Sequence, residues 1–172
     1  MSANNVHHGL PSVSKNEHLD FPMGGAMGKA SSLGLGLALA QPDRKVMVVD
    51  GDGSLLMNLG SLVTVGNKAP ENLYHFVFEN GVYAITGGQP VPGSGDTNFA
   101  GMAREAGYAS VYEIDNTEDL ATSLDGILEQ KGPTLICLKI VPVIENTPVQ
   151  FRDRPSRTTQ IAMKDLQGAL AD

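Results

Sequence analysis

The chain contains a single cysteine, Cys137, and no tryptophan. One thiol excludes a framework of disulfides within the chain and any metal site built from four cysteines. No run of apolar residues approaches the ~20 that a membrane-spanning helix requires. The first thirty residues are polar and lack the apolar stretch of an export signal. We therefore expect a protein that works in the reducing environment of the cytoplasm.

Basic residues are also scarce. The sequence has 12 Lys and Arg against 19 Asp and Glu, which gives a formal net charge of −7 and a pI of about 5.0. Nucleic acids and anionic membranes bind to basic surfaces, so neither is an expected partner. Small molecules and other proteins remain as expected partners. A length of 172 residues, 41% of them hydrophobic, is sufficient for one domain with its own core.

Strand and helix patterns alternate along most of the chain. Residues 1–20 show neither periodicity and are predicted to form an irregular arm, followed by one domain over 21–172. The patterns predict strands at 45–50, 73–78, 111–114 and 134–140, and helices at 28–40, 54–67, 99–106, 117–130 and 158–170. This order predicts a three-layer α/β/α fold with a mostly parallel central sheet and helices on both faces.

The most informative motif is Gly51-Asp52-Gly53-Ser54, which lies between the apolar run 46–49 and a predicted helix. Its two glycines let the backbone turn tightly and approach a ligand, and the helix would begin at Ser54 with unpaired N–H groups. Asn80 follows Asp52 by 28 positions. Asp52 and Asn80 each follow the carboxyl end of a predicted parallel strand, so both are expected at the rim where such sheets bind ligands.

These residue types suit a magnesium ion that bridges the protein to a diphosphate. Mg²⁺ takes oxygen ligands in near-octahedral geometry, commonly one or two protein groups together with phosphate oxygens. Asp52 would supply a carboxylate oxygen, Asn80 an amide oxygen and Val82 a backbone carbonyl. The N–H groups of Gly53 and Ser54 would bind the diphosphate. Taken alone, Gly-Asp-Gly also occurs as a plain turn from strand to helix, and the motif leaves that alternative open.

Three longer strings extend the motif: GGAMGKASSLGLGLALA, VVDGDGSLLMNLGSLVT and ENGVYAITGGQP, all within residues 23–90. They resemble the diphosphate-binding half of thiamine diphosphate enzymes. More narrowly, they resemble the small β subunits of sulfopyruvate decarboxylases and the corresponding region of phosphonopyruvate decarboxylases. Glu79 stands where the general family signature often has a first asparagine before Asn80. The departure leaves the expected ligand, Asn80, in place.

The resemblance implies thiamine diphosphate and Mg²⁺ as cofactors. It implies that the Gly25 carbonyl accepts a hydrogen bond from the amino group of the aminopyrimidine. Met27 would pack beneath the cofactor, between its two rings, and these two residues are the expected catalytic positions. Without the resemblance, Met27 would be interpreted as a core methionine of a buried helix. The cofactor-binding residues implied in full are Gly25, Ala26, Met27, Gly51, Asp52, Gly53, Ser54, Asn80, Val82 and Tyr83.

The activity that the resemblance implies is decarboxylation of a short acidic 2-oxo acid, such as sulfopyruvate or phosphonopyruvate, to an aldehyde. Enzymes of this kind also need a glutamate against the pyrimidine ring nitrogen, carried by a separate domain of similar size. This chain is too short for both domains. We therefore expect a separate pyrimidine-binding α subunit, in an α₂β₂ or larger assembly.

Alternatives remain open at this point. The same cofactor would serve a carboligase similar to acetolactate synthases, and it would also suit a non-catalytic cofactor-binding subunit. A 2-oxoacid:ferredoxin oxidoreductase β subunit shares the motif, but that class is expected to have cluster cysteines or a longer chain. Cys137 alone does not supply them.

Several other polar residues are candidate functional groups. His7 and His8 could reach an anionic substrate, although a solvated arm is the plainer interpretation. His75 alternates into a strand and is expected to be a core or interface histidine. The string Thr86-Gly87-Gly88-Gln89 is interpreted either as part of the substrate pocket or partner interface, or as a structural turn. The last group, favoured as a solvated face or as salt bridges between subunits over an anion site, comprises Arg152, Arg154 and Arg157.

Overall fold

The computed structural model describes residues 10–144, 147, 149–151 and 157–171. His7, His8, Arg152 and Arg154 therefore lie outside the described residues. Among the described residues, no helix is long and apolar enough to cross a membrane. The boundary between an arm over 1–20 and a domain over 21–172 stays a prediction.

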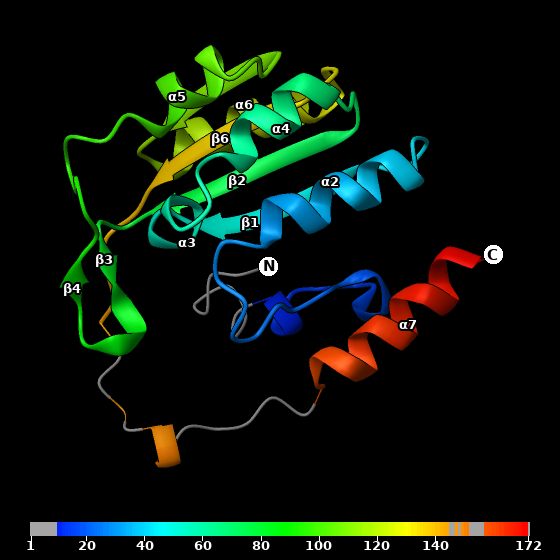
Figure 1. Ribbon diagram of the computed structural model, residues 1–172, viewed down its shortest axis with the longest axis horizontal. Coiled ribbons are helices and arrows are strands. Elements are labelled where there is room, and N and C mark those ends of the chain that lie inside the picture. The colour runs from blue at the N-terminus through cyan, green and yellow to red at the C-terminus, as the bar shows by residue number, and fades with distance from the viewer. Residues whose placement is uncertain (1–9, 145–146, 148, 152–156, 172) are drawn as a thin grey trace.

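A four-stranded parallel sheet forms the centre of the molecule (Figure 1). Its strands lie in the order β1, β2, β6, β5 and comprise β1 (Val46–Gly51), β2 (Leu73–Glu79), β6 (Thr134–Lys139) and β5 (Ser110–Ile114). Each neighbouring pair is parallel, which confirms the predicted parallel sheet. Because β1 and β2 are adjacent, their carboxyl ends lie side by side, with Gly51 opposite Phe78.

Helices cover both faces of this sheet and complete the three predicted layers (Figure 1). The larger core lies on one face, beneath α2 (Ala30–Ala40), α4 (Ser61–Lys68) and α5 (Phe99–Glu105). The smaller core lies on the other face, beneath α6 (Thr117–Glu129), around Tyr74 and Ile136. Asn98 and Asn116 cap α5 and α6, since each side chain accepts a backbone N–H three residues ahead.

The helix predicted over 54–67 is wrong as a single element. The chain forms α3 (Asp52–Leu56) and α4 (Ser61–Lys68), with a turn between them. After Leu56 the backbone changes to shorter-range bonds, since Met57 N–H donates to Ser54 O and Asn58 N–H donates to Leu55 O. The side chain of Asn58 also donates, through Nδ2, to the Gly28 carbonyl at 3.0 Å. A tertiary contact therefore interrupts a sequence that is helical by its apolar spacing.

The glycine- and proline-rich segment 81–98 is more ordered than a loop. It contains a two-stranded antiparallel hairpin, β3 (Val82–Tyr83) with β4 (Gln89–Pro90), joined through the 3-10 turn η3 (Ala84–Thr86). The Thr86 hydroxyl donates to Gln89 Oε1 at 3.0 Å, and Gln89 Nε2 donates back to the Thr86 carbonyl at 2.7 Å. This pair of bonds supports the interpretation of the Thr-Gly-Gly-Gln string as a structural turn.

The two ends of the described chain lie together at the side of α2 (Figure 1). The short turns η1 (Leu10–Ser12) and η2 (Glu17–Leu19) lie on the N-terminal side, and α7 (Thr159–Ala171) follows the turn η4 (Val149–Phe151). Arg157 Nε donates to Asp165 Oδ2 at 2.9 Å, and Arg157 NH1 donates to the Asp20 carbonyl at 2.9 Å. The one described member of the arginine cluster thus binds within its own chain.

Two glycines of α2 provide a test of how closely this helix packs on the sheet. Gly34 is buried against β1, and a Cβ added there would overlap Val48 Cγ2, a stiff β-branched side chain. Gly36 is exposed and a Cβ there would meet nothing within 4 Å. We expect Gly34→Ala to lower the free energy of unfolding by about 1–3 kcal/mol. Gly36→Ala should raise it by up to about 1 kcal/mol, because alanine favours helix.

Urea denaturation of both variants checks this expectation. Both variants make the same glycine-to-alanine change in the same helix. Equal changes in unfolding free energy would therefore contradict close packing of α2 on β1 at Gly34.

Candidate functional site

A cavity of about 250 Å³ opens at the carboxyl ends of β1 and β2. It brings together nine of the ten residues that sequence analysis assigns to the cofactor; the tenth, Ala26, does not line it. The predicted residues in its wall are Gly25, Met27, Gly51, Asp52, Gly53, Ser54, Asn80, Val82 and Tyr83. Residues from three separate segments of the chain therefore meet at the predicted rim.

Asp52 lies in the floor of this cavity with only 4% of its surface exposed. Its Oδ2 accepts the Gly81 N–H at 2.7 Å, and its Oδ1 accepts the N–H of Gly53 at 2.7 Å. The first bond joins the rim of β1 to the turn that follows β2. Burial raises the pKa of Asp52, the Gly81 and Gly53 N–H groups partly offset this, and the charge of Glu79 raises it again.

The carboxylate of Asp52 fits a cation. A carboxylate offers about four acceptor directions, which its two bonds to Gly81 and Gly53 do not exhaust. A buried anion is unfavourable, and a bound cation removes that cost. No cluster of three His, Cys, Asp or Glu side chains suited to a metal occurs among the described residues. A single carboxylate beside amide and carbonyl oxygens fits an ion such as Mg²⁺, which commonly takes part of its oxygen ligands from a bound phosphate.

Asn80 and Val82 are held in position by a local bond. The Val82 N–H donates to Asn80 Oδ1 at 3.0 Å, which orients the amide oxygen in the wall of the cavity. The Gly53 N–H, which is expected to bind a diphosphate, donates in this structure to the carboxylate of Asp52. Its role toward a diphosphate stays a prediction. Helix α3 begins at Asp52, two residues earlier than predicted, so the carboxylate lies within reach of this first-turn N–H.

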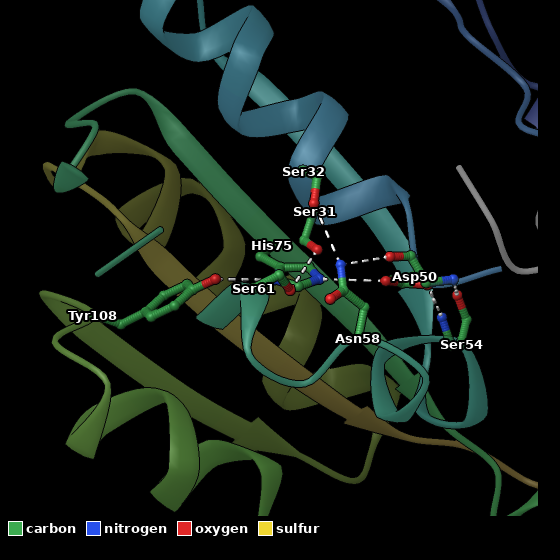
Figure 2. Close-up of polar contacts among 10 residues, drawn as sticks. Ser31, Ser32, Asp50, Ser54, Asn58, Ser61, His75 and Tyr108 are labelled. Atoms are coloured by element: carbon green, nitrogen blue, oxygen red, sulfur yellow. Dashed lines mark hydrogen bonds and ion pairs between the residues drawn. The ribbon is translucent and has the colours of Figure 1, made fainter. Parts of the chain in front are cut away.

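Met27 is 40% exposed and lies in the turn before α2, not inside a buried helix. The alternative of a core methionine is therefore wrong. The Gly28 N–H donates to Ser54 Oγ at 2.9 Å, and Asn58 Nδ2 donates to the Gly28 carbonyl (Figure 2). These two bonds fasten the turn that carries Met27 to helix α3 and to the turn that follows it.

Gly53 is required by close packing at the cavity wall. A Cβ added at Gly53 would lie 2.5 Å from Tyr83 Cε1 and 3.1 Å from Val91 Cγ2. The second glycine of the motif therefore admits the hairpin residue Tyr83 against α3. Gly25, at the opposite lip, has a φ of 73°, a conformation that glycine adopts without strain.

Part of the cavity wall was not predicted from sequence. Its apolar portion comes mainly from Phe78, Ala84, Ile85 and Ile140. Thr86 also lines the cavity, as one interpretation of the Thr-Gly-Gly-Gln string expects. Ile140 follows the end of β6, the third strand at the same rim. The order of strands across the sheet would have been needed to place it there, since β6 lies beside β2 although it comes much later in the chain.

Glu79, the departure from the general signature, binds Cys137. The Cys137 thiol donates to Glu79 Oε2 at 2.9 Å. Burial and the neighbouring Glu79 carboxylate raise the pKa of this thiol well above its usual range. Cys137 therefore stays protonated and acts as a hydrogen-bond donor in the core, not as a nucleophile.

Comparison with known proteins identifies the family. A family model described as thiamine pyrophosphate enzyme, C-terminal TPP binding domain, matches residues 2–138. The chain belongs to this family. Thiamine pyrophosphate is thiamine diphosphate, so the predicted resemblance and the cofactor class are confirmed.

Individual relatives carry more specific names. The chain is 50% identical over 122 residues to a phosphonopyruvate decarboxylase of Streptomyces hygroscopicus, covering 71% of this chain but only 30% of that relative. It is 38% identical over 141 residues to a sulfopyruvate decarboxylase subunit beta of Methanocaldococcus jannaschii, covering 80% of this chain and 74% of the subunit. The chain therefore spans under a third of the first relative and about three quarters of the second.

A solved structure supports the fold. The crystal structure of transketolase from Campylobacter jejuni matches with a TM-score of 0.56 and 19% sequence identity. The match covers 67% of this chain and 20% of that one. The predicted α/β fold with a mostly parallel sheet is confirmed.

Proposed function

We propose that this chain is the diphosphate- and Mg²⁺-binding subunit of a thiamine diphosphate-dependent 2-oxo acid decarboxylase. One observation carries the proposal: the buried Asp52 carboxylate and the oriented Asn80 amide oxygen face one cavity at the ends of adjacent strands. This placement supports a cation held between the protein and a diphosphate. The names of the relatives support the substrate class, a short acidic 2-oxo acid such as sulfopyruvate or phosphonopyruvate.

Each of the candidate site residues has a defined role in this proposal. Asp52, Asn80 and the Val82 carbonyl hold Mg²⁺, which neutralises the buried carboxylate and the diphosphate together. Met27 supports the cofactor from the turn before α2, and the Gly25 carbonyl accepts a hydrogen bond from its amino group. Bound thiamine diphosphate supplies the electron sink for loss of carbon dioxide. The apolar wall, including Phe78 and Ile140, excludes water from the reacting carbon.

The cavity also supports a role for a partner subunit. Apolar side chains lie exposed on the chain around its mouth and on the segment after β6, namely Met27, Ile140, Val141, Val143 and Ile144. Exposed apolar patches of this kind mark interaction surfaces. Within the described lining, Asp52 is the only acidic residue, so the activating glutamate of the pyrimidine would come from another chain.

Calorimetric titration with thiamine diphosphate tests the cofactor assignment. We expect saturable binding in the presence of Mg²⁺ and its loss when the metal is chelated with EDTA, because Asp52 alone would repel the diphosphate. Titrations with and without the partner subunit distinguish a missing partner from a wrong assignment. Absence of Mg²⁺-dependent binding in both preparations would contradict the proposed function.

Product analysis tests the reaction class. The assembled enzyme is expected to release carbon dioxide and one aldehyde from sulfopyruvate or phosphonopyruvate, and to use pyruvate poorly. The same reaction is repeated with an added aldehyde acceptor. Formation of a hydroxy ketone in place of the aldehyde would assign the chain to a carboligase.

A further inference from the structure

Three polar side chains, those of Asp50, His75 and Tyr108, form a buried triad behind the candidate site. Asp50 lies near the end of β1, His75 in the middle of β2 and Tyr108 in the loop before β5. Asp50 and His75 have no exposed surface, and Tyr108 is 5% exposed. His75 lies between Tyr108 and Asp50 in Figure 2. None of the three lines the cofactor cavity.

The contacts of this triad lead toward the Gly51-Asp52 turn. The Tyr108 hydroxyl lies 3.2 Å from His75 Nδ1, and His75 Nε2 lies 3.8 Å from Asp50 Oδ2. The other oxygen of Asp50, Oδ1, accepts the Gly51 N–H at 2.9 Å. The Asp50 carboxylate therefore accepts a hydrogen bond from the first peptide of the motif and faces the histidine at a distance too long for a direct hydrogen bond.

The proton of the Tyr108 hydroxyl orients the hydrogen bonds of this triad. Burial raises the pKa of Tyr108 well above its usual range, and the charge of Asp50 raises it further. The hydroxyl therefore keeps its proton and can donate it to His75 Nδ1. When Nδ1 accepts this bond, the remaining ring N–H is on Nε2, which faces Asp50. A hydrogen bond donated by Tyr108 therefore favours the ring form with an N–H on the side of the carboxylate.

A polar triad of this kind costs free energy inside an apolar core. Three polar side chains are removed from water here, and apolar residues of similar volume would fill the same space without that cost. Leu55, Leu62 and Val77 pack nearby in the same apolar core. Through Asp50 the triad also holds a backbone group by a hydrogen bond, the Gly51 N–H, on the residue before Asp52.

We propose that Tyr108 and His75 are positioning residues that act through Asp50 to fix the Gly51-Asp52 turn. They set the direction of the Asp50 carboxylate, which holds the Gly51 peptide and with it the orientation of the Asp52 side chain. Because Asp52 binds a ligand only under the proposed function, the effect on affinity rests on that function. The effect on the turn itself does not.

Tyr108→Phe tests this role, and Tyr74→Phe is its matched control. Tyr74 is 2% exposed, and its partly buried hydroxyl lies 2.9 Å from the Leu128 carbonyl and 2.7 Å from the Gln130 carbonyl, on the opposite face of the sheet. Both variants lose one hydrogen-bonded hydroxyl. Only Tyr108→Phe is expected to speed amide hydrogen exchange at Gly51 and Gly53, and to weaken Mg²⁺-dependent thiamine diphosphate binding roughly tenfold.

Substitutions of His75 separate positioning from simple core packing. His75→Gln keeps an amide donor near the Nε2 position and should retain much of the affinity and exchange protection. His75→Leu removes the donor and should lose both. Thermal unfolding midpoints are recorded for all four variants, so that loss of global stability is recognised.

The outcomes are distinct. Equal exchange at Gly51 in Tyr108→Phe and Tyr74→Phe would overturn the positioning role, as would changes that only follow the unfolding midpoint. Faster exchange confined to Tyr108→Phe would support it even if the unsubstituted protein bound no thiamine diphosphate. That last result would contradict the proposed function alone.

Discussion

Asp52→Ala is expected to weaken Mg²⁺-dependent thiamine diphosphate binding by more than about 100-fold, while the protein still folds cooperatively. Loss of groups that only orient a ligand costs about 10–100-fold in metal affinity, and loss of the charged ligand itself should cost more. The fold is retained because Asp52 is unfavourable without a cation: burial raises its pKa, so ionising it costs free energy. Removing the side chain relieves that cost, but it leaves the Gly53 and Gly81 N–H groups without this acceptor.

The measurement is calorimetry with Mg²⁺ and thiamine diphosphate, combined with circular dichroism. Asp125→Ala is the control, since Asp125 is exposed on α6. In the unsubstituted protein, protons and Mg²⁺ compete for the same carboxylate. Because the pKa of Asp52 is raised, Mg²⁺ affinity should start to fall, as the pH is lowered, at a higher pH than for an ordinary aspartate. Unchanged affinity in Asp52→Ala would refute the cation site.

The position of the site follows from sequence through one rule about parallel sheets. Asp52 and Asn80 each follow a strand, and parallel strands end at the same rim, so the order of elements along the chain is enough to predict their proximity. Folding adds the bond that joins the two ends, from the Gly81 N–H to Asp52 Oδ2 at 2.7 Å. Met27 and Gly25 were placed by resemblance alone, because nothing in their local pattern distinguishes a cofactor support from a core residue.

Other features were not predictable because they depend on contacts distant in sequence. The break between α3 and α4 depends on the Asn58 amide, which binds the carbonyl of Gly28 thirty residues earlier. Ile140 reaches the cavity because β6 lies beside β2 in the sheet. The contact between His75 and Tyr108 joins residues 33 positions apart through the core, so His75 could be assigned only to a core or an interface.

Asp52 is the only acidic side chain in the described wall of the cavity, and this bears on the proposed division of the active site. The proposed function requires a pyrimidine-activating glutamate, and the described lining offers only the carboxylate of Asp52, which the proposal assigns to the cation. One carboxylate cannot serve both purposes. Under the proposed function, the activating glutamate would therefore come from outside this cavity wall, and this chain would hold the anchored end of the cofactor.

The purified chain alone is accordingly expected to show no decarboxylase activity, and full activity should appear when a pyrimidine-domain subunit is added. The neighbouring reading frame is the first place to seek that subunit. Carbon dioxide release from sulfopyruvate and phosphonopyruvate is measured for this chain, for the partner and for the mixture. Replacing the partner's activating glutamate by glutamine should lower the rate of the mixture at least about 100-fold, the usual contribution of a positioned proton-transfer group.

Assembly provides an independent control for the same expectation. Val141→Asp places a charge on the exposed apolar segment after β6, whereas Val63→Asp places one on the exposed face of α4. If the partner covers the mouth of the cavity, only the first substitution should weaken association, measured by analytical ultracentrifugation of the mixture. Turnover by the chain alone at the rate of the mixture would refute the division of the active site, because the chain would then have supplied the activating acid itself.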